Sequence, residues 1–116
     1  MDKIISKIAA LGVPGLFLIT AIGGTGLVGG AAITTALAAL GPGGIIGGII
    51  TLGVIGLVAE AITEYGFDKI FIGVVKELYK RGETKDSILN KIERYPVSKG
   101  LKRELRESLE KVSNRS

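Results

Sequence analysis

Hydrophobic positions along the chain follow two patterns, and the change between them lies at Glu60. From Ile8 to Ala59 the sequence has 52 consecutive positions without a charge. After Glu60, apolar positions recur with helical spacing and charged residues fill the positions between them. A helix in water needs a polar face, so a long uncharged run indicates burial in lipid or within an assembly. The change predicts a membrane-inserted region over 1–62 and a charged helical region over 63–116.

Glycine-rich turns divide the first region into three apolar segments, at about 4–22, 25–40 and 43–62. The last two are separated by Gly-Pro-Gly-Gly at 41–44, a strong turn signal. A helix needs about 20 residues to cross the hydrocarbon core of a bilayer. Residues 43–62 meet that length, and 25–40 meet it together with part of the preceding loop. They predict a glycine-rich transmembrane helical hairpin, with 4–22 as a third span or an interfacial helix.

The positions of the cations predict how this hairpin is oriented. Lys3 and Lys7 precede the uncharged run, and Lys69, Lys76, Lys80 and Arg81 follow it. Because cytoplasmic flanks of membrane helices are rich in Lys and Arg, we expect both termini in the cytoplasm. The predicted location is a bacterial inner or plasma membrane. The segment 4–22 then lies in the interface or re-enters the bilayer, with a bend at Pro14-Gly15, whereas three spans put the termini on opposite sides.

Residues 63–116 carry clear helix signals and no convincing strand signal. The apolar positions of 67–78 recur at i, i+3, i+4 and i+7, which predicts an amphipathic helix ended by Gly82. Thr84 and Ser98 are placed to cap two further helices, which form a short charged tail. The expected inward positions of these helices are Ile88, Leu89, Ile92 and Tyr95, then Leu101, Leu105, Leu109 and Val112. The chain is therefore predicted to be all-α. The aromatic face of 67–78 packs on the tail helices or lies on lipid headgroups.

Fourteen of the 18 glycines lie within the uncharged run. Glycine weakens a helix in water, but in lipid it lets two helix backbones approach closely. Small-xxx-small spacing, together with two small-residue faces on a helical wheel of 43–62, gives a set of candidate helix-packing residues, which predicts a homo-oligomer: Gly26, Gly30, Gly44, Gly47, Gly48, Gly53 and Gly56. The alternative is that some of these glycines mark loops and turns.

Residues 12–59 resemble glycine-zipper membrane proteins, a class that includes pore formers, holin-like hairpins and small glycine-rich bacteriocins. The resemblance rests on composition and small-residue spacing, and it implies membrane helices that associate through glycine. Glu60 and Glu64 are candidates for the mouth of an oligomeric pore that selects cations. The alternative is that they mark the point where the helix leaves the bilayer.

The residue inventory excludes most reaction chemistry. The chain has no cysteine and no histidine, so it offers no thiolate nucleophile, no imidazole base and no histidine or thiolate metal ligand. Gly-x-Gly-x-x-Gly at 24–29 lacks both a βαβ pattern and a P-loop lysine, so nucleotide binding is not expected. We therefore expect no catalytic residue, cofactor or metal. The net charge of +4 is too small and too mixed with acids for a nucleic-acid partner, but it suits anionic lipid.

The leading functional hypothesis is a small oligomerising membrane protein that forms a pore or otherwise permeabilises or remodels a bilayer. Such a protein acts as a bacterial toxin or defence effector, and its tail over 83–116 controls assembly or recruits a protein partner. The alternative is a structural protein whose glycine-rich block polymerises into a filament or shell, because an exposed apolar surface of this extent forces assembly in water.

Overall fold

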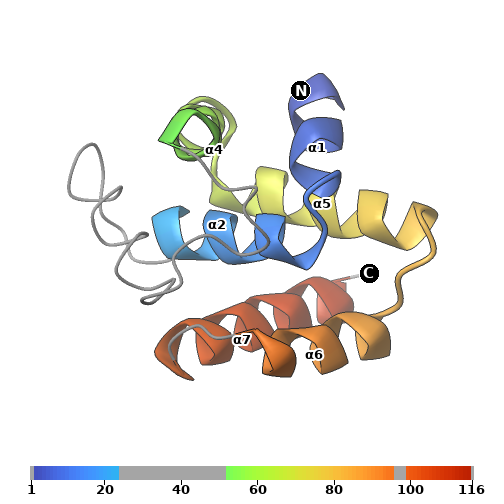
Figure 1. The fold of residues 1–116 in the computed structure, drawn as a ribbon. Coiled ribbons are helices and arrows are strands. Elements are labelled where there is room, and N and C mark those ends of the chain that lie inside the picture. Colours follow the sequence, from blue (N-terminus) through green and yellow to red (C-terminus); the bar gives the residue numbers. More distant parts are fainter. Residues whose placement is uncertain (1, 24–51, 96–98, 116) are drawn as a thin grey trace.

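The computed structural model describes residues 2–23, 52–95 and 99–115. These residues form six α-helices and no strand, which confirms the all-α class. The helices are α1 (Asp2–Ala9), α2 (Val13–Gly23), α4 (Leu52–Tyr65), α5 (Phe67–Lys80), α6 (Lys85–Arg94) and α7 (Lys99–Arg115). They lie in three layers, with α1 and α4 on one side, α2 and α5 in the middle, and α6 and α7 on the other side (Figure 1).

Helix α2 is the centre of the core, because it contacts α1, α4, α5, α6 and α7. Every residue from Val13 to Ile22 is buried, and Leu16, Phe17, Leu18 and Ile19 have no exposed surface. A helix that is apolar on all sides has to be covered on all sides, and here the other helices provide the cover.

The segment 4–22 forms two helices, and the chain bends by 116° between them. The bend lies at Ala10–Gly12 and not, as predicted, at Pro14-Gly15. Gly12 adopts a φ of +75°, a backbone conformation that residues with a Cβ rarely adopt. Pro14 lies in the first turn of α2, where its missing N–H costs no helical hydrogen bond. Gly15 lets the two helices touch, since a Cβ there would lie 2.5 Å from the carbonyl oxygen of Ile8.

Among the described residues, no helix is by itself long and apolar enough to cross a bilayer. Helices α1 and α2 together reach the required length and composition, but only as a bent pair. Helix α4 covers the end of the predicted span 43–62, and the rest of that span lies outside the described residues, as does 25–40. The structure therefore does not confirm the transmembrane hairpin.

The predicted amphipathic helix is confirmed as α5. Its apolar face is buried and consists of Ile70, Phe71, Val74, Val75 and Leu78. This face is part of the core, but it packs mainly on α1, α2 and α4 and not, as one interpretation had it, on the tail helices. The close approach to α1 uses Gly73, where a Cβ would meet the side chain of Ile5.

The two tail helices are also confirmed, and they form an antiparallel pair under α2 (Figure 1). Their inward residues are buried and include Ile88, Ile92, Leu101, Leu105, Leu109 and Val112. The ring of Tyr95 meets Phe17 of α2 edge-on, with the ring centroids 5.5 Å apart. Lys85 Nζ lies 3.0 Å from the Glu110 carboxylate, and Arg106 pairs with Glu93. The tail pair is thus joined by ionic contacts and meets α2 through apolar ones.

Candidate functional site

The structure describes only two of the glycines that the sequence predicts as helix-packing residues. Gly26, Gly30, Gly44, Gly47 and Gly48 lie outside the described residues. Gly53 and Gly56 lie in α4, and a Cβ built on Gly56 would have no heavy atom within 4 Å. Gly56 therefore makes no close helix contact within the described fold. Its contact with a second copy remains a prediction.

Glu60 and Glu64, the candidate pore-mouth residues, are exposed and lie one turn apart on α4. The opposite face of α4 is buried through Ile55, Val58 and Ala61. The two carboxylates therefore point away from the core of this chain. A ring of such carboxylates in an oligomer remains a prediction.

A cavity of about 300 Å³ lies where the C-terminal end of α2 meets the first turn of α5 and the middle of α7. From α2 and α5 it is lined by Thr20, Gly23, Phe67 and Asp68. From α7 it is lined by Glu104, Glu107, Ser108 and Lys111. These α7 positions recur every three or four residues, so they lie on the side of the helix next to its buried leucine stripe. The wall is therefore polar on the α7 side, and Phe67 supplies an aromatic side.

Thr20 is the unusual member of this set, because its side chain is buried and its hydroxyl has no hydrogen-bond partner. A threonine hydroxyl within a helix commonly donates to a backbone carbonyl of the preceding turn. Thr63 does this, with its hydroxyl 2.9 Å from the carbonyl oxygen of Ala59, but Thr20 does not. A buried hydroxyl without a partner is uncommon in a folded protein, because burial removes its hydrogen bonds to water and no protein group replaces them.

A smaller pocket of about 60 Å³ continues the cavity along the groove between α5 and α7. Both spaces share Phe67, Asp68, Ser108 and Lys111. Beyond these, the smaller pocket is lined by Phe71, Ile72 and Val112. The rings of Phe67 and Phe71 stack with their centroids 5.5 Å apart, so this end of the groove is apolar.

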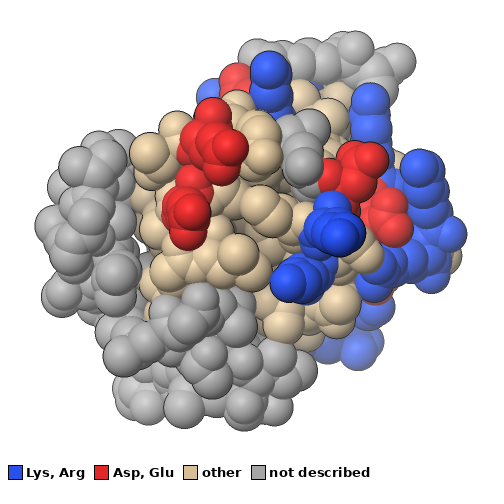
Figure 2. Space-filling view, turned by 90° about the horizontal axis from the view of Figure 1, so that it is seen from above, with Lys and Arg blue, Asp and Glu red and all other residues tan. Residues whose placement is uncertain are grey.

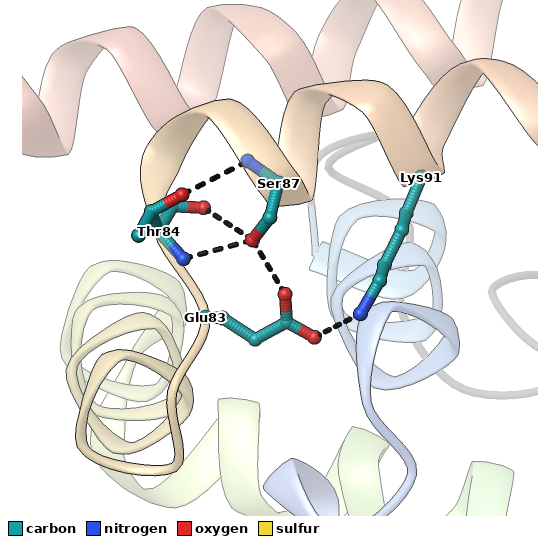
Figure 3. Close-up of polar contacts among 4 residues, drawn as sticks. All are labelled: Glu83, Thr84, Ser87 and Lys91. Atoms are coloured by element: carbon teal, nitrogen blue, oxygen red, sulfur yellow. Dashed lines mark hydrogen bonds and ion pairs between the residues drawn. The ribbon is translucent and has the colours of Figure 1, made fainter.

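The junction of α5 and α6 is a second polar cluster, and it has a structural role (Figure 3). Helix α5 ends in a Schellman motif, in which Gly82 has a φ of +105° and the N–H of Glu83 bonds to the carbonyl of Leu78. Thr84 then caps α6, as predicted: its hydroxyl accepts from the Ser87 N–H, and its own N–H donates to the Ser87 hydroxyl. The cluster fixes the direction in which the tail pair leaves α5.

Glu83 completes this cluster as an acceptor. Lys91 donates to one of its carboxylate oxygens, and the Ser87 hydroxyl donates to the other at 2.6 Å. The hydrogen bond from Lys91, followed by that from Ser87, lowers the pKa of the Glu83 carboxyl below its ordinary value. Because both donors come from the first two turns of α6, Glu83 ties the linker to that helix.

Charge is unevenly distributed over the face that α1 and α4 form (Figure 2). Basic side chains gather toward one edge, acidic side chains form separate groups, and uncharged surface lies between them. Within the described part of the chain, the acids form no group that could hold a metal ion.

Sequence reasoning did not find the cavity. The spacing of charges along one helix does not show which neighbouring helix those charges meet. The signal that was present is the lone polar side chain in an otherwise apolar helix, Thr20 in α2.

Comparisons with protein-family models, with curated proteins and with solved structures found no match, so this candidate site rests on its own geometry.

Proposed function

We propose that this chain is a small membrane-active protein that oligomerises and permeabilises or remodels a bilayer. The observation that carries the proposal is α2, a helix without a charge that is buried on all sides. It leads directly into residues 24–51, which add 28 further positions without a charge. The chain thus keeps an apolar helix inside a cover of amphipathic helices whose outer faces are charged.

This arrangement suits exchange between a compact form and a membrane-bound form. Lipid tails are as apolar as the leucine and isoleucine side chains that surround α2, so α2 loses little when lipid replaces protein. The tail pair is the part of the cover best suited to move, because it meets α2 through apolar contacts while ionic contacts hold it together. Basic residues on the cover favour approach to an anionic surface, by about 1 kcal/mol for each Lys or Arg close to it.

Release of a trapped dye from anionic liposomes tests the proposal with the purified chain. We expect release that falls as salt is raised, because screening weakens attraction of the basic residues to the headgroups. Absence of release, together with absence of binding to the liposomes, would refute the proposal. If the purified protein instead forms large particles without detergent or lipid, the filament or shell hypothesis is favoured.

A cross-link tests whether the tail pair has to separate from α5 before the protein releases dye. The chain has no cysteine, so Ile72→Cys and Ser108→Cys, on opposite sides of the groove, can be bridged with a bis-maleimide. We expect the bridged protein to bind liposomes but to release little dye. The control is Glu104→Cys with Ser108→Cys, which places both ends of the bridge on α7. Equal release from both bridged proteins would exclude parting of the groove.

Gly56→Leu tests the oligomer. A Cβ on Gly56 would meet no heavy atom within 4 Å, so we expect leucine there to act mainly on contacts with other copies. Gly100→Leu is the matched control, since Gly100 is also a helical glycine with open space beside it. We expect only the α4 variant to reduce the cross-linked oligomer in liposomes. An unchanged oligomer in that variant would exclude this face of α4 as the contact.

A further inference from the structure

The cavity at the end of α2 has the charge, size and lining of a site for an extended organic cation, and we infer that it binds a polyamine. The inference does not rest on the proposed membrane activity. It rests on three features of the cavity: the carboxylates that line it, their separation from one another, and the unpaired hydroxyl of Thr20.

The cavity is acidic although the chain as a whole is basic. Asp68, Glu104 and Glu107 line it, and Lys111 is the one cation among its described lining residues. The lining therefore holds more acidic than basic side chains, in a chain whose net charge is +4. A polycation is therefore attracted to this place.

The separation of the carboxylates selects the class of cation. No group of three acids in the described ranges lies close enough together to hold a metal ion. A space of about 300 Å³ is also far larger than one ion needs. A polyamine fits both facts, because its ammonium groups are held apart by methylene chains. Phe67 offers the methylene chain an apolar contact and offers an ammonium the face of an aromatic ring.

Thr20 supplies the observation that points to a missing ligand. Its hydroxyl can accept a hydrogen bond from an ammonium, and nothing in the free protein uses it. Because Thr20 has no exposed surface, an ammonium reaches its hydroxyl only when neighbouring side chains move aside. Lys111 is a cation in the same lining, so an incoming polyamine competes with it for the carboxylates and adds positive charge to an acidic place.

Titration calorimetry of the full chain with spermidine tests the inference, with butylamine as a monoamine control. We expect saturable binding of spermidine and much weaker binding of butylamine. Glu104→Gln and Glu107→Gln should each weaken spermidine binding about threefold to fivefold, the range expected for a partly exposed charge pair. Glu110→Gln is the matched control, because this α7 acid does not line the cavity and instead contacts Lys85. Its affinity for spermidine should be unchanged.

Two more variants separate binding from folding. Lys111→Gln should tighten spermidine binding, a gain that a misfolded protein cannot produce. Thr20→Val keeps the shape of the side chain and removes the hydroxyl, so it should weaken binding without lowering the melting temperature of the free protein. The inference is overturned if spermidine does not bind saturably, if Lys111→Gln weakens binding, or if Glu110→Gln weakens it as much as Glu104→Gln does.

Discussion

Gly15→Ala is the change for which the fold makes its sharpest stability prediction. A Cβ at this position would lie 2.5 Å from the carbonyl oxygen of Ile8, a backbone atom that already accepts a hydrogen bond from Leu11 at 3.0 Å. The oxygen cannot rotate away as a side chain would, so α1 has to shift as a unit. Such a shift disturbs the buried contacts of Ile5 and Ile8.

The expected magnitude follows from two opposing effects. Alanine is better than glycine inside a helix by about 1 kcal/mol. Forcing an extra carbon into a tightly packed contact costs about 1–3 kcal/mol, and the upper part of that range applies because the obstacle is backbone. We expect a net loss of about 2 kcal/mol in the free energy of unfolding, which lowers the melting temperature by about 10 °C in a domain of this size.

Gly73→Ala is the matched control. Its Cβ would also meet α1, but it meets Cδ1 of Ile5, the far end of a flexible side chain. That methyl group can turn aside, so the change in stability should stay within about 1 kcal/mol of zero. Urea unfolding followed by circular dichroism measures both variants. The reasoning is refuted if Gly15→Ala is as stable as the parent chain, or if Gly73→Ala loses more stability than Gly15→Ala.

Three further changes probe the tail pair and its linker. Gly82→Ala should cost about 1–2 kcal/mol in the same urea assay, because its φ of +105° strains any residue with a Cβ. Leu105→Ala should cost about 2–5 kcal/mol, since this side chain is fully buried in the core; a smaller loss would mean that α7 packs loosely. The lowered pKa of Glu83 means that its carboxylate stabilises the fold above its unfolded-state pKa, and that this stabilisation is lost as the pH falls through the folded-state value. Glu83→Gln should therefore remove part of the acid-induced loss of stability, and an unchanged pH profile of unfolding would contradict that role.

Local signals in the sequence determined the helices of residues 63–116. The helical spacing of apolar residues located α5, α6 and α7, because each of these helices has one wet face and one buried face. Gly82 and Thr84 located the boundary between α5 and α6, since a positive φ and an N-cap depend mainly on neighbouring residues. These predictions needed no knowledge of which helices meet.

The tertiary structure decided the packing of these helices and where the cavity lies. A helix that is apolar on all sides suits lipid and the centre of a protein equally, so composition could not show that α2 is enclosed by the other described helices. The buried face of α5 meets α1, α2 and α4. The turn between α1 and α2 lies at Gly12, whereas the sequence predicted a bend at Pro14-Gly15. The cavity unites Thr20, Phe67 and Glu104, which are distant in sequence and share no local pattern. Their proximity depends on how three helices pack, and packing depends on the fit of whole surfaces, which no local spacing encodes.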